Sequence, residues 1–263
     1  MSRFTHLGRI VDLRLLTTRL SLVLVSVWAV VGYLNEGWAG VFDCGVAAVL
    51  GWMLARELDP DHPWIAVLVA ALAGAPGLVG VDVGLRATLI VIASARLMVR
   101  STGLAAKLTD IFVVGAVAVA WATGPGGWAV GMGLAVAIAL DAGTDRTRLG
   151  LAALIGLGVT AVGALTGGVT STWSTPTLVH LGVVVAGLGA TAIARPRPLQ
   201  SVGDYTGEVL DPTRLSIARI IVVGAATLAA LAGGGSAVGV TSVIWITVTV
   251  VGVASRLRPS FRG

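Results

Sequence analysis

Long apolar runs, separated by short polar or glycine-rich breaks, recur from one end of the chain to the other. They do not alternate polar and apolar residues as the strands of a membrane β-barrel do. Their lengths approach the roughly 20 residues that a helix needs to cross a bilayer. The pattern predicts an all-α, polytopic membrane bundle of about ten transmembrane helices, in a single domain over residues 1–263. The expected helices are 15–34, 41–54, 64–81, 84–99, 108–122, 128–140, 149–165, 177–194, 215–232 and 237–254.

The central pair of segments, residues 108–140, leaves an alternative open. Both arms around the turn Gly124-Pro125-Gly126-Gly127 are short for a full crossing. They could instead form a re-entrant hairpin, which would leave eight full spans. The number of crossings is even in both cases, so the two termini lie on the same side.

Two stretches of the chain resemble each other. Leu58-Asp59-Pro60 is followed by Ile-Ala at the same spacing as Leu210-Asp211-Pro212. The similarity predicts a parallel internal repeat, with units 15–99 and 149–256 on either side of the hairpin 108–140. Chance similarity between sequences rich in alanine, valine and glycine is the alternative.

Composition narrows the class of protein. Hydrophobic residues make up 56% of the chain and charged residues 12%, about half the charged fraction of a soluble domain. This excludes an ordinary soluble enzyme, and the high hydrophobicity excludes a disordered chain. The net charge of +5 therefore indicates contact with a membrane surface, and no nucleic-acid partner is expected.

The charges are sorted between the two sides of the predicted bundle. With the N-terminus in the cytoplasm, Arg86 is the only basic residue of 18 that falls outside. By the positive-inside rule, this sorting predicts that both termini are cytoplasmic. Lys107 is the only lysine, and arginine suits phosphate and carboxylate partners that accept its planar fork. A GC-rich genome that encodes arginine in place of lysine is the alternative. We expect a prokaryotic inner (plasma) membrane. The first apolar run has no small-residue cleavage site after it and is expected to be a retained helix.

The loop from Arg56 to Pro63 is the first candidate site. Its Glu57, Asp59, Asp61 and His62 are candidate catalytic residues, because oxygen-rich clusters suit Mg²⁺ and an imidazole adds a softer ligand. Asp59, Asp61 and His62 are the candidate metal ligands. The alternative is a solvated turn in which Asp59 and Asp61 cap the following helix.

A second group of charges lies on the other predicted cytoplasmic ends. Asp141 and Asp145 are further catalytic candidates, and their spacing of four would put them on one face of a continuing helix. Arginines among acids suit a phosphate or an anionic phospholipid head group. Non-specific contact with anionic lipid is the alternative. The binding candidates in this group are Arg56, Arg96, Arg100, Asp110 and Arg146.

A third group lies in the outer half. Asp43 and His180 fall inside predicted spans, where ionisable groups are costly and are candidates for a proton or Na⁺ relay. Asp82 and Arg86 are four residues apart and are expected to form an ion pair. The alternative is that these side chains reach water or head groups.

These groups predict a transporter or permease for a small solute or a coupled ion. A membrane-embedded enzyme acting on a lipid-linked phosphate from the cytoplasmic face is the alternative, and a non-catalytic membrane subunit is a second alternative. Acids that converge within metal-ligand distance would favour the enzyme, whereas a closed inner face with a cavity would favour transport.

Overall fold

The computed structural model describes residues 5–7, 11–124, 126–166, 178–193 and 199–257. In these residues the secondary structure is helical, and the one β-type contact is an isolated bridge between Val202 and Val209. The prediction of an all-α fold is therefore confirmed for the part of the chain that is described.

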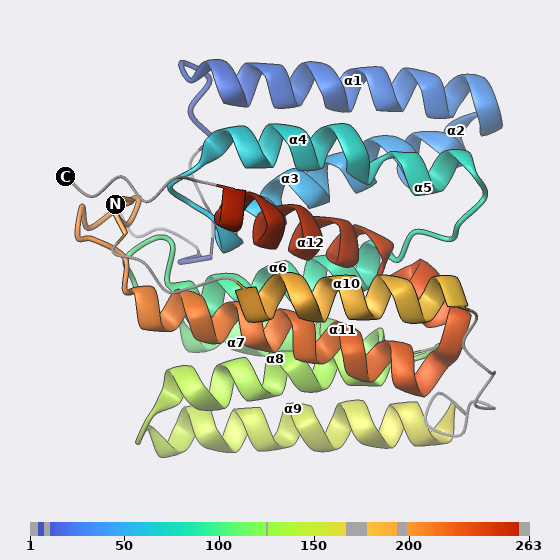
Figure 1. The fold of residues 1–263 in the computed structure, drawn as a ribbon. Helices are drawn as coiled ribbons and strands as arrows, with labels where there is room; N and C mark the ends of the chain where they lie inside the picture. Colours follow the sequence, from blue (N-terminus) through green and yellow to red (C-terminus); the bar gives the residue numbers. More distant parts are fainter. Residues whose placement is uncertain (1–4, 8–10, 125, 167–177, 194–198, 258–263) are drawn as a thin grey trace.

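Helices occupy each of the ten predicted apolar segments, and Figure 1 shows them running back and forth along one common direction. The elements are α1 (Leu16–Glu36), α2 (Trp38–Gly40), the π-helix η1 (Val41–Val46), α3 (Ala47–Leu58), α4 (Pro63–Ala73), α5 (Ala75–Leu78), α6 (Leu85–Val99), α7 (Leu108–Ala120), α8 (Gly127–Ala142), α9 (Arg146–Leu165), α10 (Leu178–Ile193), α11 (Pro212–Val240) and α12 (Ser242–Leu257).

Four stretches of helix are long and apolar enough to cross a membrane: α1, the continuous run Trp38–Leu58, α9 and α11. Shorter apolar helices pack between them. Large apolar side chains on α1, including Val23, Val30 and Leu34, are exposed. An apolar surface of this extent is costly in water and favourable in lipid, so the fold is that of a helical membrane bundle.

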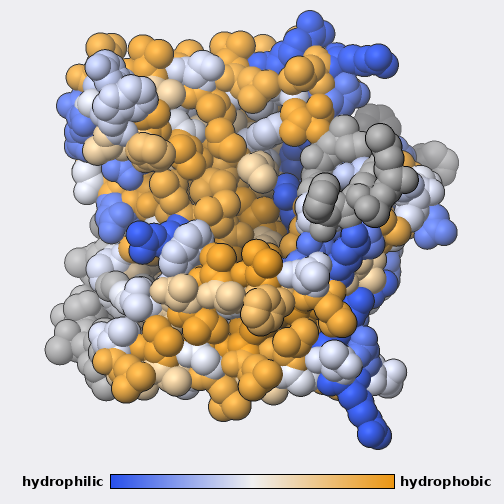
Figure 2. Space-filling model, turned by 180° about the vertical axis from the view of Figure 1, so that it is seen from behind, coloured by the Kyte–Doolittle hydropathy of each residue, from blue (hydrophilic) through white to orange (hydrophobic). Residues whose placement is uncertain are grey.

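The two ends of the bundle differ in polarity. The end of α8 and the starts of α9 and α11 lie together at the left of Figure 1, and we call this the polar end. In Figure 2 most hydrophilic residues gather along the corresponding edge of the molecule. The opposite end carries residues 79–84, the turn around Gly124 and Gly126, and the junction between α11 and α12.

Glycine allows the first two helical stretches to touch through their backbones. A methyl group added to Gly32 in α1 would overlap the carbonyl of Gly40. A methyl group added to Gly45 in η1 would also be too close to Ala29, at 2.9 Å from its Cβ. Small residues at such contacts are typical of membrane helices, where close packing stabilises association.

The break predicted between residues 232 and 237 is a kink inside α11. Gly234 has φ 57° and ψ −142°, a conformation that glycine adopts at little cost. The helix continues beyond the kink to Val240, and Thr241 forms the turn into α12. The predicted boundary was therefore too early by several residues.

The paired motifs of the predicted repeat have different local structures. The carboxylate of Asp211 caps α11 by accepting the N–H of Thr213 at 2.7 Å. Asp59 follows the end of α3, and its carboxylate contacts the ring of His62 instead. The repeat itself stays a prediction.

Candidate functional site

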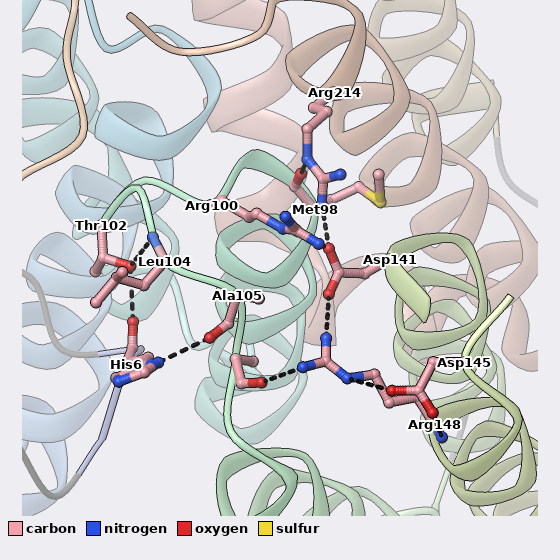
Figure 3. A network of polar contacts seen from close by, with 11 residues as sticks. His6, Met98, Arg100, Thr102, Leu104, Ala105, Asp141, Asp145, Arg148 and Arg214 are labelled. Carbon is pink, nitrogen blue, oxygen red and sulfur yellow. Dashed lines mark hydrogen bonds and ion pairs between the residues drawn. The ribbon is translucent and has the colours of Figure 1, made fainter. Parts of the chain in front are cut away.

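Asp141, in the last turn of α8, is the centre of a network at the polar end (Figure 3). Its side chain is only 2% exposed, and three arginines donate to it. Nε of Arg100 lies 2.8 Å from Oδ1, and Nη1 of Arg148 lies 3.2 Å from Oδ2. Arg214, from the first turn of α11, also donates to Oδ1. One carboxylate thus joins α8 to α9, to α11 and to the loop after α6.

The backbone between Asp141 and Asp145 explains why these two aspartates have different partners. Gly143 adopts φ 57° and ends α8 directly after Ala142. Asp145 then begins the next helix as its N-cap, accepting the backbone N–H groups of Thr147 and Arg148. The expectation that Asp141 and Asp145 share one helical face is therefore wrong. They meet through Arg148 instead, whose Nε lies 3.3 Å from Oδ2 of Asp145.

Arg100 holds an unusual backbone conformation. It caps α6 with φ 51° and is the one non-glycine residue with positive φ in the described chain. Such a conformation costs of order 1 kcal/mol or more and persists where its surroundings enforce it. The bond from Arg100 to Asp141 and the bond from Arg214 Nε to the carbonyl of Met98, at 2.7 Å, fix this turn from both sides.

A second set of contacts ties α3 to α6 and α11. Glu57 is 1% exposed, and its Oε1 lies 3.0 Å from Nε of Arg96. Arg96 also donates from Nη1 to the carbonyl of Leu7 at 3.1 Å. From α11, Arg219 donates twice to the carbonyl of Leu58, at 2.9 and 2.6 Å. The predicted site residues Glu57 and Arg96 therefore form an interhelical bridge.

Residues 5–7 lie across the loop before α7 and complete this end. The N–H of His6 donates to Oδ2 of Asp110 at 2.9 Å, and its ring Nδ1 lies 2.8 Å from the carbonyl of Ala105. Thr102 donates its hydroxyl to the carbonyl of His6 at 2.9 Å. Asp110 also accepts the N–H of Lys107. Asp110 thus accepts two backbone N–H groups, one from its own helix start and one from His6. The contacts of His6 were not predicted.

The metal candidates turn to different partners. Asp59 Oδ1 lies 2.8 Å from Nδ1 of His62, whereas Asp61 accepts the N–H groups of Gln200 and Ser201. The alternative expectation, that these acids cap α4, is wrong, because His62 occupies the N-cap without a side-chain bond. No group of three His, Cys, Asp or Glu side chains suited to a metal ion occurs among the described residues.

The surroundings of Asp61 lower the pKa of its carboxyl group. Burial raises its pKa, but the hydroxyl of Ser201, the N–H groups of Gln200 and Ser201, and the charge of His62 outweigh burial. The net pKa of Asp61 lies below its ordinary value. Its carboxylate is therefore ionised at neutral pH and holds the loop from residue 199 against the turn before α4.

Arg56 and Arg146 are the remaining predicted arginines of this end. Arg56 places its guanidinium 5.7 Å from the centre of the Trp52 ring on the same helix. Arg146, the first residue of α9, is exposed at the polar end. Within the described chain, Arg146 is not among the arginines that donate to Asp141.

Three of the four candidates of the outer half, Asp43, Asp82 and Arg86, have described side chains. Asp43 lies in η1, and the side chain of His180 lies outside the described residues. Asp82 and Arg86 line one pocket of about 400 Å³, but no ion pair within 4.0 Å joins these two described side chains. Arg86 instead lies over the ring of Trp121, at 5.8 Å from its centre. The prediction of an ion pair between Asp82 and Arg86 is therefore wrong.

A larger cavity at the opposite end was not predicted. A groove of about 970 Å³ lies between α4, α10 and α12 and reaches from Val79 to Thr249. Asp82 also lines this groove, as do Gly235 and Ser236, directly after the kink in α11. No local pattern signals the groove, because its walls come from segments more than 150 residues apart in the chain.

No protein family model, no characterised protein and no solved structure matches this chain. The geometry of the two ends is therefore the basis for the function.

Proposed function

We propose that this protein is an alternating-access transporter for an amphipathic solute, open at the end opposite the polar end. The observation that carries the proposal is the contrast between the two ends. Ion pairs and loops tie helices together at the polar end, whereas a groove of about 970 Å³ enters the bundle from the other.

The polar end has the properties of a closed gate. Asp141 and Glu57 are buried carboxylates that draw arginines from neighbouring helices. Charged pairs of this kind hold one arrangement of helices and release another when they part. Asp59, Asp61 and Asp141 contact separate partners, and no three acids or histidines of the described chain gather at one point, which favours transport over the alternative of a metal-assisted enzyme.

The kink in α11 supports a binding site at the other end. Gly234 interrupts the helix, and the residues that follow it line the groove. Transporters bind substrates at interrupted helices, because the break supplies backbone groups and a place to bend. The serine and threonine hydroxyls of Ser236, Ser242 and Thr249 are the further polar groups of this lining.

The proposed orientation follows the charge pattern, with the polar end and both termini in the cytoplasm of a prokaryotic cell. Arg146 and the partly exposed Arg100 would then face anionic lipid head groups. The turn around Gly126 packs against Ala229, about 26 Å along α11 from Pro212 at 1.5 Å per residue. A turn at that depth supports full crossings by the pair 108–140, and so ten spans in all, rather than a re-entrant hairpin.

The test uses accessibility of the groove. In a Cys44→Ala background, Ser236→Cys places one thiol in the groove. Arg100→Gln weakens the network but leaves Asp141 two other arginines. We expect Arg100→Gln to open the polar end, close the groove and slow alkylation of the thiol several-fold.

The matched control is Arg146→Gln, which removes an exposed arginine from the same end. It is expected to leave the rate of alkylation unchanged. If Ser236→Cys is alkylated at the same rate alone, with Arg100→Gln and with Arg146→Gln, and the thermal stability is preserved, the two ends are not coupled. That result would contradict alternating access.

A further inference from the structure

We propose that the opposite end binds a zwitterionic lipid, with its head group between Asp82 and Arg86 and its acyl chain in the groove. This inference rests on the proposed transport function and names the class of substrate. It follows from the charges of two adjoining cavities, which meet at one carboxylate.

The lining of the groove is mostly apolar, with three hydroxyl side chains and one acid. Asp82 is the only charged residue among the described residues that line it, and the buried side chain of Trp245 belongs to the same lining. A volume of about 970 Å³ is at the upper end of the range for small-molecule sites, which is roughly 300–1,000 Å³. The groove therefore suits a large apolar body that carries a positive group close to one end.

Asp82 is held at the boundary between the groove and the smaller pocket. Residues 81–84 are not helical and lie against the end of α11. The N–H of Gly84 donates to the carbonyl of Val240 at 3.0 Å, and Gly239 packs against Val81. This contact fixes the backbone of the segment, so that Asp82 lines both cavities.

The smaller pocket adds the opposite charge. Arg86 lines it and stacks over Trp121, which orients the guanidinium. A planar guanidinium binds phosphate through two parallel hydrogen bonds, and a carboxylate accepts from an ammonium group. Asp82 and Arg86 lie in one pocket of about 400 Å³ without an ion pair between them, which leaves room for a ligand that contacts both.

The charges of Asp82 and Arg86 and the position of the groove indicate the class of ligand. A simple cation would meet Arg86, and a simple anion would meet Asp82, whereas a phosphate joined to an ammonium satisfies both. The groove lies over α12, and both α4 and α10 pack against α12. Leu72 and Val79 on its rim are exposed apolar residues, so the acyl chain enters from the hydrocarbon of the bilayer.

The test is equilibrium binding of lysophosphatidylethanolamine with a brominated acyl chain to the full chain in detergent, read by quenching of tryptophan fluorescence. We expect Asp82→Asn to weaken this binding about tenfold, because the ammonium loses a charged partner. Binding of brominated lysophosphatidylglycerol, which lacks the ammonium, should not weaken. Arg86→Gln should weaken both lipids, because both carry the phosphate.

Glu36→Gln is the matched control, since Glu36 is an acid at the end of α1 that lines neither cavity. Equal affinity of the wild type and Asp82→Asn for the ethanolamine lipid would overturn the site. Displacement of the lipid by free leucine at comparable concentration would also overturn it, because leucine is zwitterionic but has neither a phosphate nor an acyl chain. If alkylation of Ser236→Cys still responds to Arg100→Gln, the transport proposal survives that result. If the lipid binds as expected but alkylation does not respond, the site stands and transport fails.

Discussion

At the scale of single residues, the network around Asp141 contains more positive than negative side chains. Three arginines surround one buried carboxylate, and among the described residues only Arg148 has a second acid, Asp145, beside it. A buried ion pair is not by itself a large source of stability, because desolvation opposes the attraction. Removing the shared carboxylate is different, since it leaves several positive charges close together without compensation.

We expect Asp141→Asn to lower the free energy of unfolding by about 3–5 kcal/mol, the range for breaking a buried pair. Asp145→Asn removes a carboxylate that is 46% exposed and should cost less than about 1 kcal/mol. Thermal unfolding of both variants in the same detergent would measure the difference. Equal midpoints would mean that Asp141 does not organise the polar end.

The sequence predicted part of this site. Asp141, Arg100 and Arg96 were candidates because they lie at the ends of apolar runs, where charges gather. The contribution of Arg214 was missed because it reaches Asp141 across 73 positions of the chain. His6 reaches Asp110 across 104. Contacts at such separations depend on how helices pack, which periodicity does not reveal.

At the scale of elements, apolar runs predicted the helices well because burial in lipid and helical hydrogen bonding act on the same residues. The π-helix η1 and the kink in α11 were missed. The kink depends on Gly234, in a chain that contains 36 glycines. Composition alone does not distinguish a glycine that bends a helix, such as Gly234, from one that allows close packing, such as Gly32.

The contact between α1 and the segment before η1 gives a direct test. Gly32→Ala should destabilise the fold, because the added methyl group overlaps the carbonyl of Gly40 and the helices must separate. Gly150→Ala in α9 adds a methyl group where, beyond the neighbouring backbone of α9, no described atom lies within 4 Å. It should be neutral or stabilise by up to about 1 kcal/mol through helix propensity.

Thermal unfolding in detergent would compare the two glycine variants. A lower midpoint for Gly32→Ala, with an equal or higher midpoint for Gly150→Ala, is the expected order. The reverse order would show that α1 is not held by backbone contact.

At the scale of the whole molecule, the polar residues at one end and the groove at the other give the bundle a direction. The described structure fixes which residues share an end, and the charge pattern proposes which end faces the cytoplasm. Val79 and Arg146 are exposed at opposite ends and report on this orientation.

In a Cys44→Ala background, a membrane-impermeant maleimide should label Val79→Cys in intact cells. It should label Arg146→Cys only after the cells are permeabilised, because the proposed orientation puts Arg146 in the cytoplasm. Labelling of Arg146→Cys in intact cells, with Val79→Cys protected, would reverse the topology.

The shared carboxylate of Asp141 also has a consequence for the synthesis of the protein. Arg100 precedes Asp141 in the chain and Arg148 follows closely, but Arg214 is made 73 residues later. At roughly 5–20 residues per second, this delay is about 4–15 s. During that interval the nascent bundle holds a carboxylate with two of its three arginines, and the arrival of α11 completes the polar end. Ribosomes stalled before residue 214 should therefore carry an inserted chain whose polar end is still open to proteases.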